Sequence, residues 1–232
     1  MKNIYRFLPF ACCFILEACV NHDSAFSRGA GGVYLDYKIS AEEGYDQLTV
    51  LIRVRAGGPH EDALLLTPPS TLDLDGELFP ADSSALLGPF YELNRPMASF
   101  AGTHVITYTD SSGKKYTREF NWQPLTLAQE LPDSIRRGRF HLQFNGLGKE
   151  DYVRVLMTDT SFLGPGVNEL DTVMNGDLPI GPSQLDELGT GPVTVELVRE
   201  RDEPIRVNGQ YLGRLRSFYT IRRSFVLLER TD

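Results

Sequence analysis

The stretch THVITYTDSSGKKYTREFNW, residues 103–122, decides the fold of this chain. Its two arms are rich in β-branched and aromatic residues, which favour extended strands. The segment between them, 110–113, reads Asp-Ser-Ser-Gly, and such small polar residues suit a tight turn. The pattern predicts a β-hairpin, the clearest local element in the sequence.

Alternation of apolar and polar residues continues on both sides of this hairpin. In residues 48–55, Leu48, Val50, Ile52 and Val54 fall on one face, as in a half-buried strand. Within 70–79, Asp75 and Gly76 predict a second hairpin turn. We expect further strands in the following segments: 34–40, 63–67, 139–146, 151–159, 192–200 and 218–230.

This density of short strands predicts an all-β protein. The strand spacing resembles that of immunoglobulin-like β-sandwiches, although the Cys…Trp…Cys pattern of antibody domains is absent. Residues 123–134 lack alternation and hold two prolines, which indicates a linker or a short helix. We therefore expect two tandem sandwich domains, 32–124 and 125–232, and a single larger β domain is the alternative.

Two segments of the second half lack a strand pattern. Residues 160–182 are rich in turn-forming residues and are expected to be a long loop, which is either a recognition surface or a crossover. Residues 183–191 are compatible with one or two helical turns, with Ser183 as the cap and Gly189 as the stop.

The N-terminus has the pattern of an export signal. Lys2 and Arg6 precede an apolar run, residues 7–16, that would be about 15 Å long as a helix. A bilayer core is about 30 Å thick, so this run is too short to cross it. We interpret residues 1–18 as a signal peptide; a buried core helix is the alternative.

The end of that segment, Leu16-Glu-Ala-Cys19, resembles the lipobox of bacterial lipoproteins, except that Glu17 is charged. The resemblance implies cleavage before Cys19 and a lipid on its sulfur, which would hold the protein on a membrane. Because Val20 is not aspartate, the outer membrane is the expected location, on either its periplasmic or its surface side. Residues 19–31 then form a flexible tether. Ordinary cleavage and free secretion is the alternative.

Charge and cysteine content exclude several classes of function. The formal net charge is −8, which disfavours a nucleic-acid partner because phosphates are bound mainly through Lys and Arg. All three cysteines, Cys12, Cys13 and Cys19, lie in the first 19 residues. The body of the chain therefore has no disulfide, thiolate metal site or cysteine nucleophile.

Catalytic and metal-binding patterns are also missing. The sequence contains no nucleophile elbow, zinc-protease motif, phosphate loop or dinucleotide fingerprint. Asp73, Asp75 and Glu77 could belong to a calcium loop, but Leu78 and Phe79 interrupt it, so a solvated hairpin is the simpler interpretation. We expect no metal, no cofactor and no enzymatic activity, with a hydrolase as the less favoured alternative.

Two basic clusters suggest where a ligand could bind. Arg136, Arg137 and Arg139 form the first, and Arg214, Arg216, Arg222 and Arg223 form the second. The candidate ligand face consists of Tyr211, Arg214, Arg216 and Tyr219; a solvated sheet with rings in the core is the alternative. The sequence thus indicates a lipid-anchored envelope protein of binding or assembly function, with an envelope protein or a glycan as partner. The narrower alternative is a carbohydrate-binding accessory lipoprotein.

Overall fold

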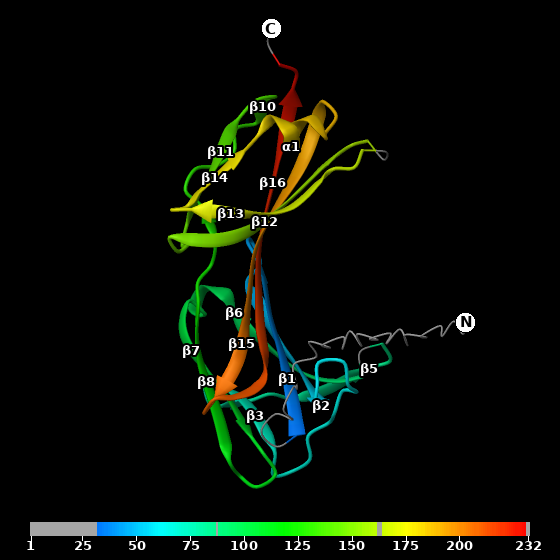
Figure 1. Ribbon diagram of the computed structural model, residues 1–232, viewed down its shortest axis with the longest axis vertical. Helices are drawn as coiled ribbons and strands as arrows, with labels where there is room; N and C mark the ends of the chain where they lie inside the picture. The colour runs from blue at the N-terminus through cyan, green and yellow to red at the C-terminus, as the bar shows by residue number, and fades with distance from the viewer. Residues whose placement is uncertain (1–31, 87, 162–163, 231–232) are drawn as a thin grey trace, which may run out of the picture.

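The computed structural model describes residues 32–86, 88–161 and 164–230, and in these ranges the chain is almost entirely β-strand (Figure 1). The expected signal peptide, Cys19 and the tether lie outside the described residues. No helix among the described residues is long and apolar enough to cross a membrane.

The first half of the chain contains eight strands and one short 3₁₀ helix among the described residues. They are β1 (Val33–Glu42), β2 (Gln47–Ala56), β3 (Thr71–Leu74), β4 (Glu77–Leu78), β5 (Ala81–Ser84), β6 (Gly88–Pro96), η2 (Met97–Ser99), β7 (Gly102–Thr109) and β8 (Lys115–Trp122). Strands β5-β6-β2-β1 form one sheet and β4-β3-β7-β8 form the other. We call this unit the first sandwich.

The second half forms the second sandwich. Its elements are β9 (Thr126–Leu127), β10 (Ser134–Arg136), β11 (Phe140–Asn145), β12 (Glu150–Asp159), β13 (Val167–Met174), β14 (Asp177–Ile180), α1 (Pro182–Asp186), β15 (Gly191–Val207) and β16 (Gln210–Leu228). The strand order β9-β11-β14-β13-β12-β15-β16 is continuous, and β10 pairs with β16. Because β13 pairs with both β12 and β14, it joins the two layers into one folded sheet.

Both strand orders are those of immunoglobulin-like sandwiches, whose strands are lettered A to G in chain order. Such sandwiches place A, B, E and D in one sheet and C, F and G in the other. In the first sandwich, β1, β2, β6 and β5 occupy the places of A, B, E and D, and β3, β7 and β8 those of C, F and G. In the second, β9-β11-β14 and β12-β15-β16 have the same relation. The predicted all-β, immunoglobulin-like fold class is confirmed.

The hairpin β15–β16 belongs to both sandwiches. It runs along most of the molecule (Figure 1), and its two strands pair from Gly191–Leu227 to Val207–Gln210. Near the second sandwich β15 pairs with β12, whereas near the first β16 pairs in parallel with β1. The sheet of the first sandwich therefore continues directly into that of the second.

A close backbone approach fixes the pairing of β1 with β16. Gly213 lies opposite Leu35, and a Cβ atom built on it would be 1.9 Å from the Leu35 carbonyl oxygen. Its φ of 151° also lies in a region that side chains rarely adopt. Only glycine satisfies both conditions at this position.

A buried ion cluster marks the waist between the two sandwiches. Arg199 Nη2 is 2.7 Å from Asp151 Oδ2, and Arg201 Nη2 is 3.0 Å from the same atom. Arg199 also donates a hydrogen bond to the Gln123 carbonyl oxygen. Asp151 and Arg199 are 5% and 4% exposed, so this pair replaces apolar packing where the hairpin changes from one core to the other.

The structure confirms several local predictions. The 103–122 hairpin is formed by β7 and β8, and the predicted apolar face of β2 is buried throughout. The turn at Asp75-Gly76 joins β3 to β4, with positive φ at both residues, so the hairpin interpretation of this acidic segment is correct. The expected helical turn is the short helix α1, residues 182–186, but its caps are Gly181 and Glu187 rather than the predicted Ser183 and Gly189.

Other local predictions were wrong. Residues 160–182 are not a long loop, because they contain β13 and β14 joined at Asn175-Gly176. Residues 63–67 form only an isolated bridge at Ala63, since this segment leaves β2 and crosses to the opposite sheet. The strands predicted at 192–200 and 218–230 are present as β15 and β16, but they are longer than expected and meet in a turn at Asn208-Gly209.

The expected division into residues 32–124 and 125–232 follows the strand order along the chain and stays a prediction. The strands β1–β8 come from the first range and β9–β16 from the second. However, the extended part of the hairpin supplies two strands to the sheet of the first sandwich. Folding of the two ranges as separate units is therefore a proposal to be tested.

Candidate functional site: a groove at the waist

We call the outer face the side of the β1–β16–β15 sheet that points away from β3, β7 and β8. Cross-strand ion pairs cover much of this face. Arg216 Nη2 lies 2.7 Å from Asp36 Oδ1, and Arg222 lies within 3.0 Å of both Glu42 and Glu196. The further pairs are Arg214–Asp202 and Arg154–Glu200. These arginines are thus neutralised by carboxylates on neighbouring strands.

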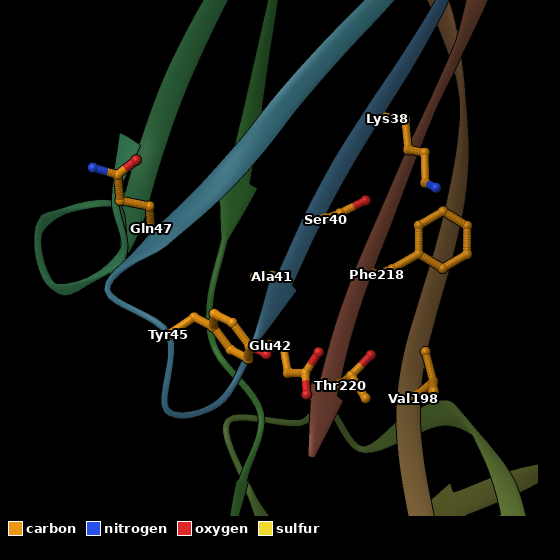
Figure 2. Close-up of a pocket in the computed structure, with 9 residues that line it drawn as sticks. All are labelled: Lys38, Ser40, Ala41, Glu42, Tyr45, Gln47, Val198, Phe218 and Thr220. Atoms are coloured by element: carbon orange, nitrogen blue, oxygen red, sulfur yellow. The ribbon is translucent and has the colours of Figure 1, made fainter. Parts of the chain in front are cut away.

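The ion pairs are interrupted at the waist by a shallow groove of about 380 Å³ (Figure 2). It lies where β1, β15 and β16 run side by side and where the β1–β2 turn approaches them. The nine residues that line it are Lys38, Ser40, Ala41, Glu42, Tyr45, Gln47, Val198, Phe218 and Thr220.

Apolar and polar groups alternate in the groove. Phe218 lies on β16 beside Val198 of β15, and Lys38 Nζ is 5.4 Å from the centre of the Phe218 ring (Figure 2). Such a cation over a ring is a favourable contact that also orients the ammonium group. Tyr45, on the β1–β2 turn, is 61% exposed and presents a second ring at the groove's end.

Several hydrogen-bonding groups in the groove are available to a ligand. The side chains of Ser40, Gln47 and Thr220 have no hydrogen-bond partner among the described residues. Glu42 is different, because its carboxylate accepts a hydrogen bond of 2.6 Å from Arg222 Nη1. The groove therefore combines one exposed ring, one half-buried ring, one cation and uncommitted donors and acceptors.

The candidate ligand face from the sequence is divided between two sides of the sheet. Arg214 and Arg216 lie on the outer face, each paired with an aspartate. Tyr211 packs at 6.1 Å from Tyr34, next to Arg214. Tyr219 points the other way, is 5% exposed and contacts the Trp122 ring at 5.9 Å. Burial, together with the nearby Glu43 carboxylate, raises the pKa of Tyr219.

No cluster of metal-binding side chains is found among the described residues. They contain no group of three or more His, Cys, Asp or Glu side chains that could hold a metal ion. Asp75, from the acidic segment considered as a calcium loop, instead accepts hydrogen bonds from His104 Nδ1 and the Val105 amide, both at 2.7 Å. This carboxylate attaches the β3–β4 turn to β7.

The groove residues were missed by the sequence analysis for a definite reason. Phe218 lies between the arginines of the second basic cluster, on β16. Lys38, Ser40 and Glu42 lie on β1, about 180 residues earlier in the sequence. Their common surface depends on the parallel register that places Ser40 beside Phe218. The available signal was the Asn208-Gly209 turn, which predicts the long hairpin but not its partner strand.

Comparisons with known proteins leave the family open. No family model matches the chain, and no curated protein sequence matches it. Among solved structures, similarity extends to DIP-gamma IG1+IG2 (10% identity, 86% of this chain and 99% of that one, TM-score 0.23). It also extends to a cytokine receptor complex (14%, 82% and 96%, TM-score 0.32) and to the Yersinia pseudotuberculosis adhesin InvE (14%, 82% and 60%, TM-score 0.22). With such low scores, the fold assignment rests on the strand order described above.

Proposed function

We propose that this chain is a non-enzymatic binding protein of the cell envelope that is held on a membrane through a lipid on Cys19. The groove at the waist is its binding site, and the ligand is an envelope protein or a glycan. The lipobox-like sequence supports the anchor, and the two tandem sandwiches supply a rigid support for the groove.

One observation carries the binding role. On an outer face otherwise covered by ion pairs, the waist presents the exposed Tyr45 and the half-buried Phe218 beside uncommitted polar groups. The Tyr45 ring is 61% exposed, so most of its surface contacts no part of the described chain. Exposed aromatic residues rimmed by polar ones are typical of interaction sites.

A photo-cross-linking experiment in the native host tests this site. Benzoylphenylalanine replaces Tyr45 in one variant and Tyr152 in a control, because Tyr152 is 46% exposed on the second sandwich. We expect a discrete cross-linked product from position 45 that disappears when Phe218→Ala is added. Equal products from both positions, or none from position 45, would contradict the proposal.

The glycan alternative is favoured by the two rings of the groove, since sugar rings stack on aromatic faces while their hydroxyls bond to polar side chains. Titration of purified envelope polysaccharide fragments against the soluble body of the protein tests it. Tyr45→Ala and Phe218→Ala should each weaken binding by about tenfold if a ring contributes about 1.4 kcal/mol. Unchanged affinity in both variants argues for a protein ligand.

The anchor is tested separately. Cells are fed an alkyne analogue of palmitate, and the protein is compared with its Cys19→Ser variant, because serine has no thiol to form a thioether. We expect label and membrane fractionation in the first and neither in the second. Label that is absent from the unmodified chain would rule out the lipid anchor and leave the groove proposal intact.

A further inference from the structure

A second opening lies in the second sandwich, between β10 and β11, and has a volume of about 330 Å³. It exists because one segment changes partner. This segment begins as β9, paired with the end of β11, and continues as β10, paired with β16. The backbone of residues 129–133 pairs with neither layer, apart from the Asp133 carbonyl, and residues 129–132 border the opening.

The edge of β11 is unpaired along this opening. On its other edge, β11 pairs with β14, and His141 lies opposite Pro179, which has no amide hydrogen. The Phe144 amide bonds toward the β14 side, whereas the Gln143 carbonyl accepts from Ala128 on the β9 side. Because backbone groups alternate along a strand, the His141 amide and carbonyl point into the opening. They are a free hydrogen-bonding site for an added strand.

Two arginines at this opening are without partners. Arg136 and Arg139 both line it and are exposed, and neither has an ion pair, hydrogen bond or ring contact among the described residues. Arg137, between them, is held in place: its guanidinium donates to the Leu185 and Leu188 carbonyls and lies 3.6 Å from Asp186. In a chain of net charge −8, two unpaired neighbouring cations attract an anionic ligand.

Two carboxylates beside the opening are already paired. Glu130 accepts a hydrogen bond of 2.6 Å from Arg223, and Asp177 lies 3.0 Å from His141 Nδ1. Beneath the polar rim, the wall is apolar, with the half-buried Leu131 and Phe140 above the buried Ile135 and Leu142. An open strand edge, free arginines and an apolar wall thus occur together.

We propose that this opening binds an extended acidic peptide segment of a partner protein. The segment adds as a strand to the free edge of β11, with its backbone on His141, an acidic side chain at Arg136 and Arg139, and an apolar side chain on the wall. Charge complementarity decides the occupant, because neither Arg136 nor Arg139 forms an ion pair with a carboxylate of the described chain. The site is separate from the groove and does not depend on it.

A random library of peptides about seven residues long, a length that spans a typical added strand, is selected against the purified body of the protein. The enriched peptides are then measured against R136Q/R139Q and against the control R214Q, whose arginine is paired with Asp202 on the outer face. We expect enrichment of acidic residues alternating with apolar ones. The double variant should weaken binding by at least tenfold, the value of one charge-assisted hydrogen bond, and R214Q should leave it unchanged.

Hydrogen exchange distinguishes strand addition from simple charge attraction. The His141 amide should exchange rapidly in the free protein and become protected when an enriched peptide is added. The proposal is overturned if no acidic peptide is enriched, if R136Q/R139Q binds as tightly as the unmodified protein, or if His141 gains no protection. Equal binding of octanoate with no protection at His141 would also overturn it, since the site would then take small amphiphilic anions.

Discussion

The two sandwiches have the same strand order but cover their edges differently. In the first, the two sheets are separate, and the free edge of β1 is covered by β16 in parallel pairing. In the second, β13 joins the two layers on one side, while the opposite side is left open between β10 and β11. Exposed strand edges can pair with strands of other chains. The first sandwich therefore has its β1 edge covered, whereas the second has a free edge on β11.

The comparison indicates that the long hairpin is the structural link of the molecule. One end of β15–β16 completes the second sandwich, and the other end seals the first. A change that detaches the hairpin from β1 should therefore damage the first sandwich and leave the second largely intact. The predictions below test this asymmetry, beginning with the largest effect.

Gly213→Ala should have the largest effect. Its Cβ would overlap the Leu35 carbonyl oxygen at 1.9 Å, so the parallel pairing of β1 with β16 cannot persist unchanged. We expect a loss of more than about 4 kcal/mol in the free energy of unfolding. Urea denaturation followed by fluorescence of Trp122 measures it, because this sole tryptophan packs against Tyr219 of the hairpin.

Gly209→Ala is the matched control, on the same hairpin. Gly209 also has a positive φ, 77°, but a Cβ built on it would meet nothing within 4 Å. Only the conformational cost of about 1–2 kcal/mol is expected. Equal losses of stability in the two variants would show that the contact with β1 does not hold the hairpin. Hydrogen-exchange protection that is lost equally from β12 and β2 in Gly213→Ala would show the same.

The ion cluster at the waist should give the next largest effect. Asp151→Ala leaves the buried Arg199 without its carboxylate, and removal of one partner of a buried pair typically costs about 3–5 kcal/mol. The double variant Asp151→Leu, Arg199→Met removes both charges and should recover most of that loss. A double-mutant cycle by chemical denaturation measures the coupling, and purely additive losses would contradict a coupled pair.

Two aspartates should respond to pH in opposite directions. Burial raises the pKa of Asp151, but hydrogen bonds from Arg199 and the Tyr152 amide outweigh it and hold that pKa below its ordinary value. Its contribution is therefore present above the unfolded pKa of about 3.9 and is lost as the pH falls through the lower folded pKa. Asp151→Asn should remove this acid-sensitive part of the stability.

Asp171, on β13, provides the opposite case. Burial, followed by the nearby Glu169 carboxylate, raises its pKa. The folded state then binds the proton more tightly, so this group lowers stability as the pH rises above its unfolded pKa. Asp171→Asn should therefore make the protein slightly more stable at neutral pH and change nothing at pH 2. Unfolding curves at both pH values check the sign for each variant.

Much of the fold could be predicted because its signals are local. The alternation in β2 and the turn between β7 and β8 each reside in fewer than about ten consecutive residues. The strands β13 and β14 could have been predicted equally well, since Asn175-Gly176 is a strong hairpin-turn signal. Both residues have a positive φ, which explains why asparagine and glycine occur there. That prediction failed because the glycines and prolines of the segment suggested a loop.

The candidate sites could not be predicted in the same way, because they depend on pairing between distant strands. Tyr219 and Arg216 are three residues apart and so fall on opposite faces of β16, a consequence of its regular alternation. The partner of β16 is β1, and no local pattern specifies a parallel contact over that separation. The arginines were correctly placed on the exposed side, but their pairing with Asp36 and Asp202 became visible only with the register.

The smallest effect is expected from the ion pairs of the outer face. Arg222 is 52% exposed and bridges Glu42 and Glu196, so Arg222→Gln should cost less than about 1 kcal/mol. That cost should fall further in 1 M salt, where screening acts within about 3 Å. Arg118→Gln, which removes the partly exposed ion pair between β8 and Glu203 of β15, is the control, because neither residue lines the groove or lies opposite a residue that does.

However, Arg222→Gln also releases Glu42 into the groove as an uncompensated carboxylate. If the outer arginines serve chiefly to neutralise the surroundings of the binding site, Arg222→Gln should change ligand affinity more than stability, and Arg118→Gln should leave ligand affinity unchanged. A salt-independent loss above about 2 kcal/mol would instead assign these pairs a structural role.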